Sequence, residues 1–151
     1  MILLEGLYKE REKVKVIKFF LIILFFASTV FAKGDLAIRA KKLELKLGSE
    51  KSDYEMSQKE FELETGKAYR LEISSMGFKE YEIEAEDFFR NIWIRSIEIE
   101  GVEIVAPVIE EIEFEREGEI EIKFVPIRPG NYEFEIEGLQ HKGMVGKFIV
   151  K

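Results

Sequence analysis

The sequence predicts an all-β sandwich preceded by an N-terminal export signal. Apolar and charged residues alternate through most of the chain after residue 40, as in Ile120, Ile122 and Phe124. Alternation with period two places one set of side chains on one face of a strand. Turn residues separate these runs at intervals of about 8–12 residues, a spacing typical of sandwiches. A short apolar segment near the N-terminus adds the prediction of export.

The N-terminal segment has the three parts of a secretory signal. A basic region is formed by Lys9, Arg11, Lys13, Lys15 and Lys18. An apolar run, FFLIILFFASTVFA, follows over residues 19–32 and becomes rich in small residues toward its end. Val30 and Ala32 then occupy the −3 and −1 positions of a cleavage site.

We therefore expect residues 1–32 to be a signal helix that is removed on export. The apolar run is shorter than the ~20 residues that span a bilayer, so we expect no stable membrane span after cleavage. An uncleaved anchor and a buried helix are the alternatives. A translation start near Val14 is a further alternative, because the first twelve residues are longer and more acidic than a signal needs.

Four alternating runs in the first half of the body predict strands. They cover residues 43–47, with a start as early as residue 36, then 61–63, 69–73 and 81–85. A polar stretch over residues 48–57 and the turns around Gly66 and Gly77 separate them. Residues 86–91 predict one helical turn.

Six more alternating runs complete the sandwich. Residues 92–104 predict two short strands about Gly101, and the later runs cover residues 112–114, 120–124, 132–136 and 148–150. Proline fixes φ and glycine permits positive φ, so the Pro126–Gly130 segment predicts a turn between two of these strands.

Charge and composition narrow the possible functions. Residues 1–32 carry five basic and three acidic side chains, and the remaining residues carry 18 basic and 27 acidic ones, a net charge of −9. So acidic a body repels phosphate backbones, which argues against nucleic acid as a partner. The absence of cysteine excludes disulfides, a lipoprotein anchor and a thiolate metal site. High charge with two Asn and two Gln is typical of thermophile proteins.

The C-terminal block carries a resemblance to a known family. A strand, P-x-x-P-G at residues 126–130, a Y-x-F strand at 132–134 and a loop with H-x-x-M at 141–144 follow one another. This order resembles the end of a cupredoxin, and F-E-L-E-T-G-K-A-Y-R-L-E-I at residues 61–73 is similar to an earlier cupredoxin segment. The resemblance covers roughly residues 36–150 and implies a Greek-key β-sandwich of cupredoxin type over residues 33–151.

The resemblance also implies where copper ligands would lie. Cupredoxins carry a ligating cysteine two residues after the Y-x-F strand, and Ile136 stands there in this chain. The first copper histidine of the family matches approximately Glu80. A blue copper site needs a thiolate and two imidazoles, whereas this chain has no cysteine and one histidine. We therefore expect no type 1 blue copper site and no thiolate-bridged binuclear site.

Four donors remain as candidate metal ligands: His141, Met144, Met76 and Glu80. Thioethers and an imidazole suit Cu(I), while His141, Glu80 and a water would hold a harder divalent ion loosely. The alternative is structural, with Met144 in the core, His141 in solvent and Met76 filling a gap beside Phe78.

A second candidate site is aromatic. Phe88, Phe89 and Trp93 lie within six residues, flanked by Arg90 and Arg95. They predict either core filling by an irregular crossover or an exposed anchor for a protein partner through Trp93 and Arg90, since Trp and Arg dominate interface hot spots.

Together these observations predict an exported binding protein, periplasmic or secreted, and not an enzyme. No nucleophile motif or phosphate loop stands out, and paired carboxylates are too common here to identify an acid–base dyad. The cargo is either a copper ion carried to or from a membrane oxidase or a protein partner. A structural subunit of an envelope or respiratory complex is the third alternative.

Overall fold

The computed structural model describes residues 39–76 and 79–151, together with Lys15 and Lys18. The chain divides into two units, Met1–Ala32 and Lys33–Lys151. Except for those two lysines, the predicted signal peptide lies outside the described residues, and it stays a prediction. Within the part of the chain described, no helix is both long and apolar enough to cross a membrane.

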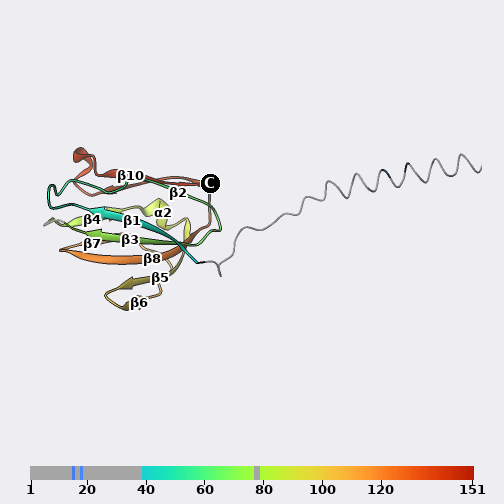
Figure 1. The fold of residues 1–151 in the computed structure, drawn as a ribbon, viewed down its shortest axis with the longest axis horizontal. Helices are drawn as coiled ribbons and strands as arrows, with labels where there is room; N and C mark the ends of the chain where they lie inside the picture. The colour runs from blue at the N-terminus through green and yellow to red at the C-terminus, as the bar shows by residue number, and fades with distance from the viewer. Residues whose placement is uncertain (1–14, 16–17, 19–38, 77–78) are drawn as a thin grey trace, which may run out of the picture. The chain divides into compact units, whose positions relative to one another are not determined.

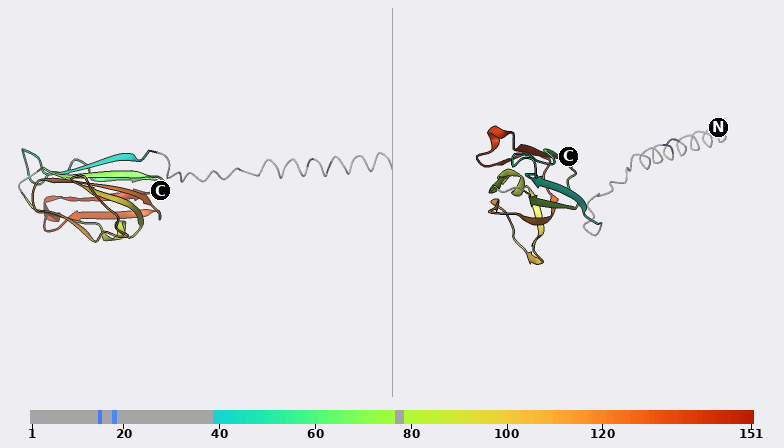
Figure 2. Two further views of the ribbon diagram at one scale, coloured as in Figure 1. Left: turned by 90° about the horizontal axis from the view of Figure 1, so that it is seen from below. Right: turned by 60° about the vertical axis from the view of Figure 1, so that its left-hand side comes forward.

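The second unit is a sandwich of two five-stranded sheets (Figures 1 and 2). Sheet A contains, in spatial order, β1 (Lys41–Leu47), β3 (Tyr69–Ser75), β8 (Gly118–Pro126), β5 (Ile92–Ile99) and β6 (Val102–Ile104). Sheet B contains β2 (Glu60–Leu63), β10 (Val145–Val150), β9 (Gly130–Ile136), β4 (Tyr81–Glu84) and β7 (Glu111–Phe114). The β1–β3 and β2–β10 pairs are parallel, and the other pairs are antiparallel. The predicted fold class is confirmed.

Most element bounds agree with the alternation, and the differences lie at ends. The start of the first strand between residues 36 and 38 lies outside the described residues. Ala85, predicted to be the last residue of a strand, lies outside it. Strand β4 stops at Glu84, and Ala85 precedes the short helix α2 (Glu86–Phe89). Pro126 and Gly130, expected in a turn, are the last residue of β8 and the first of β9. Proline is compatible with a strand end, where no ladder donor is needed.

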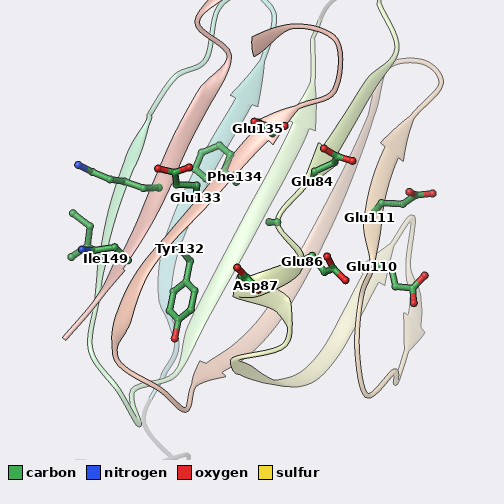
Figure 3. Close-up of a pocket in the computed structure, with 13 residues that line it drawn as sticks. Glu84, Glu86, Asp87, Glu110, Glu111, Tyr132, Glu133, Phe134, Glu135 and Ile149 are labelled. Carbon is green, nitrogen blue, oxygen red and sulfur yellow. The ribbon is translucent and has the colours of Figure 1, made fainter.

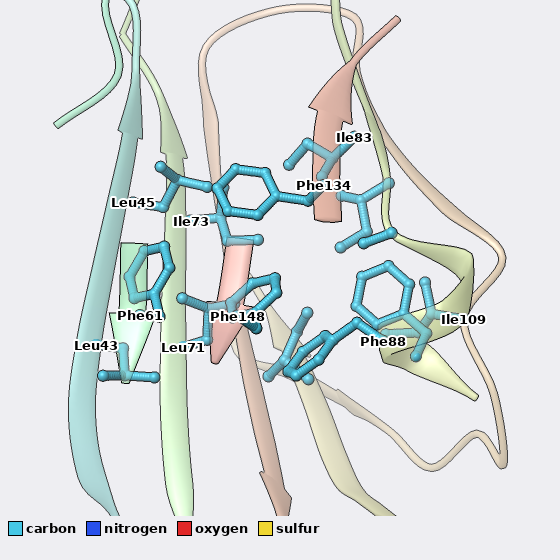
Figure 4. Close-up of a cluster of buried hydrophobic side chains, with 14 of the residues drawn as sticks. Leu43, Leu45, Phe61, Leu71, Ile73, Ile83, Phe88, Ile109, Phe134 and Phe148 are labelled. Carbon is cyan, nitrogen blue, oxygen red and sulfur yellow. The ribbon is translucent and has the colours of Figure 1, made fainter. Parts of the chain in front are cut away.

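The core forms between the inward faces of the two sheets. Tyr69, Leu71 and Ile73 of β3 lie opposite Phe124, Ile122 and Ile120 of β8, and all six are buried. An aromatic stack fills the middle of the sandwich, with the Phe88 and Phe148 centroids 3.8 Å apart (Figure 4). Phe88 comes from α2, so this single helical turn closes the core and Phe89 is buried with it.

A β-bulge in β5 decides which side chains of that strand face outward. The register with β8 shifts between Ile94 and Ser96, so Ser96 and Ile97 are both buried. A bulge adds one residue to a strand and turns the following side chains to the opposite face. Trp93, before the bulge, lies on the outer face of sheet A by alternation with the buried Ile92 and Ile94, while the bulge returns Ile97 to the core side.

Candidate functional site

The two connections that carry the candidate metal donors approach one another at one end of the sandwich. Lys79 Nζ lies 5.7 Å from the centroid of the Tyr54 ring, and Lys142 Nζ lies 5.1 Å from the same centroid. Lys79 belongs to the connection between β3 and β4, and Lys142 to the 3-10 helix η1 (Gln140–Lys142) between β9 and β10. The shared tyrosine shows that both connections approach the same corner.

The four candidate metal donors occupy different environments within that end. Met144 is fully buried with 0% exposure, and its backbone oxygen accepts a hydrogen bond from Ile136 N at 3.0 Å. His141 and Glu80 are exposed, and the Met76 side chain is 50% exposed. Among the described residues, no three His, Asp or Glu side chains gather closely enough to hold a metal ion. The Met144 thioether therefore points to the core, and the His141 imidazole points to solvent.

The donor set does not fit a type 1 copper ion. Ile136, at the position where the family resemblance implies a cysteine, is fully buried in the core and offers only hydrocarbon. The chain contains one imidazole and no thiolate, and a blue copper centre requires two of the former and one of the latter. We derive no electron-transfer step from this site.

Trp93 forms the wall of a small pocket on the outer face of sheet A. Its side chain is 48% exposed, although Phe88 and Phe89 nearby are buried. The pocket has a volume of about 270 Å³ and includes Arg95 and Lys123 in its lining. A half-exposed indole between two cationic side chains can receive a flat or acidic group of a partner.

The cations near Trp93 are partly engaged already. Lys123 Nζ contacts Glu98 at 3.0 Å and Glu121 at 3.2 Å, and the hydrogen bond that Lys123 donates to Glu98 is the main cause that raises the pKa of Lys123. Arg90 pairs with Glu86 one helical turn earlier and remains exposed. The predicted partner residues Trp93 and Arg90 are thus both accessible, but only Trp93 lines a pocket.

An acidic face that sequence reasoning did not single out covers sheet B (Figure 3). Glu84 of β4 lies opposite Glu111 of β7 and Glu135 of β9, which brings three carboxylates into cross-strand register. Beside them, a hydrogen bond with Glu137 and partial desolvation raise the pKa of Glu82 to about 7. The repeated Ile-Glu alternation predicted outward carboxylates on each strand, whereas only the register shows which of them are neighbours.

Comparisons with known proteins support the fold alone. No family model and no curated protein match the chain. A multicopper oxidase from Campylobacter jejuni matches with a TM-score of 0.52 at 11% identity, over 81% of this chain and 32% of that one. A multicopper oxidase from Pediococcus acidilactici also matches with a TM-score of 0.52, at 12% identity over 78% of this chain and 27% of that one.

An auracyanin matches over nearly its whole length. Auracyanin from Roseiflexus castenholzii has a TM-score of 0.49 and 16% identity, over 76% of this chain and 99% of that one. This chain therefore spans about a third or less of the two oxidases and essentially all of the auracyanin. At these identities the two oxidase matches show a cupredoxin-like fold and assign no ligand.

Proposed function

We propose that this cupredoxin-like sandwich is an exported binding module, periplasmic or secreted, that holds a partner protein and catalyses no reaction. The observation that carries the proposal is the half-exposed Trp93 in its pocket. Exposing a large indole on a sheet face leaves apolar area in water at a cost of about 25 cal/mol per Å². A partner that covers the indole recovers this free energy, which is why tryptophan is enriched at interface centres.

The chemistry of the pocket suits an acidic or aromatic partner group. Arg95 and Lys123 lie beside the indole, and Arg90 adds a further exposed cation near the start of β5. Among the described residues, the pocket lining includes Arg95 and Lys123 and no carboxylate, although the body as a whole is acidic. Electrostatic complementarity at such a patch directs encounter and orientation more than it adds affinity.

The test is co-purification from the native compartment followed by affinity measurement with the partner identified. We expect Trp93→Ala to weaken binding by about 2 kcal/mol, roughly 30-fold, as for a central hot spot. Tyr54→Ala is the matched control, because Tyr54 is another exposed aromatic, 39% exposed, and does not line the Trp93 pocket. Equal affinity of both variants for the partner would contradict the proposal. Co-purification with membrane proteins is the result expected of a structural subunit.

A second candidate function is Cu(I) binding by His141, Met144, Met76 and Glu80. The observation that favours it is the common position of the two donor-bearing connections, which share contacts with Tyr54. Because the Met144 side chain is buried, use of its thioether requires the loop of residues 139–144 to open. Cargo delivery to or from a membrane oxidase is the role this binding would serve.

A Cu(I) titration under reducing conditions tests this second candidate. We expect near-stoichiometric binding that weakens at least about tenfold in His141→Ala and Met144→Leu, since leucine keeps the volume of the buried thioether. Met56→Leu is the matched control, because Met56 packs against the core and is not among the proposed donors. Unchanged binding in both donor variants would show that these residues do not hold copper.

A further inference from the structure

Exposed aliphatic side chains gather at one edge of the sandwich. Five of the ten large hydrophobic residues exposed in the described part of the chain lie between residues 99 and 108. They are Ile99, Val102, Ile104, Val105 and Val108. Single exposed hydrophobic residues are normal on a protein surface, whereas a gathered set marks a surface that another molecule covers.

Three of these residues, Ile99, Ile104 and Val108, border a groove between the free edges of the two sheets. Strand β6 ends sheet A and β7 ends sheet B, and in the described residues β6 pairs only with β5 and β7 only with β4. Figure 1 shows β6 at the margin of the sandwich beside β5. The groove has a volume of about 780 Å³ and borders every residue of β7, while Ile97, Ile120 and Phe114 lie buried along it. We call it the β6–β7 groove.

The lining of the β6–β7 groove is strongly acidic. It includes one arginine, Arg116, and the carboxylates of Glu100, Glu110, Glu111, Glu113, Glu115, Glu117 and Glu119. A second copy of this chain would bring the same carboxylates to the contact, and like charges placed opposite each other are unfavourable. An anionic lipid surface is repelled for the same reason. Charge complementarity therefore selects a basic occupant.

We propose that the β6–β7 groove binds an extended segment of a partner protein in which lysine or arginine alternates with aliphatic residues. The segment adds as a strand to the free edge of β7, so its backbone completes the unpaired ladder. Side chains alternate between the two faces of a strand. The aliphatic side chains of the segment therefore face inward onto Ile104 and Val108, and its basic side chains face outward beside Glu111 and Glu113. Strand β7 fits this role because Ile112 and Phe114 point inward while Glu111 and Glu113 are exposed.

This inference is independent of the Trp93 surface. Trp93 lines the pocket on the outer face of sheet A, and the β6–β7 groove shares no lining residue with that pocket. Loss of partner binding in Trp93→Ala therefore leaves the groove untested, and occupation of the groove leaves the Trp93 proposal untested. The experiment below is designed around the groove alone.

The probe is a synthetic peptide of about seven residues that alternates Lys and Val, a typical strand length. The comparison peptides are one of the same composition with Lys and Val in separate blocks and one that alternates Glu and Val. Titrated into the full chain, the alternating basic peptide should bind at least about tenfold more tightly than either comparison peptide. Its affinity should fall between about 50 mM and about 500 mM salt.

Two matched variants assign the binding to the groove. Val108 and Val145 are 43% and 41% exposed, and only Val108 lines the groove. Val108→Lys should weaken the alternating peptide at least about tenfold, and Val145→Lys should leave the affinity unchanged. Hydrogen exchange on the unmodified protein gives a second readout, because half of the β7 amides gain partners when a strand is added.

Four results would overturn the proposal. The first is equal affinity for the alternating and blocked basic peptides, which would mean charge attraction without strand addition. The second is an equal effect of Val108→Lys and Val145→Lys. The third is self-association of the free protein that Val108→Lys abolishes, since the occupant would then be a second copy. Slower exchange confined to residues outside β7 would likewise place the peptide elsewhere.

Discussion

Replacement of Gly146 by alanine should destabilise the sandwich strongly, although the change in side-chain size is small. Gly146 lies on β10 opposite Phe134 of β9. A Cβ at this position would lie 2.6 Å from the backbone oxygen of Lys59 and would also press on the Phe134 ring. Neither neighbour can yield freely, because that oxygen accepts a hydrogen bond from Lys147 N at 2.8 Å.

The Phe134 ring is held from the other side as well. Its centroid lies 5.0 Å from that of Phe148 and 6.1 Å from that of Phe61. Overpacking of this kind costs about 1–3 kcal/mol, and a weakened backbone hydrogen bond adds about 0.5–1.5 kcal/mol. Removal of glycine from the unfolded chain offsets about 0.4–1 kcal/mol, which leaves a net loss of about 2–3 kcal/mol.

Urea unfolding and calorimetry of residues 33–151 measure this loss directly. We expect the Tm of Gly146→Ala to fall by about 10 °C. Gly118→Ala is the control, because a Cβ there meets the Phe114 ring at an ordinary 3.6 Å. A Gly146→Ala loss below about 1 kcal/mol, or one no larger than that of Gly118→Ala, would refute the argument that β10 and its two neighbours are packed too closely for a side chain.

Two further predictions concern charge and turn geometry. The pKa of Glu82, raised from 4.5 to about 7 chiefly by the hydrogen bond with Glu137, means that the folded state favours the protonated form, so the contribution of this carboxyl to stability is present in acid and is lost as pH rises through about 7. Glu82→Gln should therefore be more stable than the unmodified protein at about pH 8 and show a flatter stability profile down to about pH 5; a parallel profile would contradict this. Glu100 has φ of 49° and precedes Gly101 at 80° in the β5–β6 hairpin, a turn that favours Asn-Gly. Glu100→Asn should raise the free energy of unfolding by about 0.5–1 kcal/mol in the same calorimetry. A lower Tm would show that the Glu100 side chain stabilises the fold by more than the strain of its positive φ destabilises it.

The strands were predictable because their information is local. Alternation in segments such as residues 69–73 and 120–124 identified β3 and β8, and the Gly101 turn between two short strands was correct. The helical turn predicted over residues 86–91 was confirmed as α2. In the aromatic cluster Phe88 and Phe89 fill the core, as one alternative predicted, while Trp93 is exposed and its role as a partner anchor stays a prediction.

The sites were less predictable because they depend on pairing between distant strands. The bulge between Ile94 and Ser96 appears only when β5 pairs with β8, so the burial of Ile97 next to buried Ser96 could not be read from local alternation. Glu84 lies opposite Glu111 and Glu135, which are 27 and 51 residues away in the sequence, and these pairings likewise follow from register. His141 and Met144 are three residues apart, yet one is exposed and the other fully buried.

By itself the sequence determined the ligand chemistry and the strand pattern. A chain without cysteine and with one histidine cannot assemble a blue copper centre in any fold, and its period-two alternation leaves strands as the only elements that bury its apolar residues. The tertiary structure alone decided that β6 and β7 end their sheets at one edge and leave an acidic, aliphatic groove between them. The reason is that strand order and register depend on how much apolar surface all ten strands bury together. No single segment contributes enough to that burial to determine which strands become its neighbours.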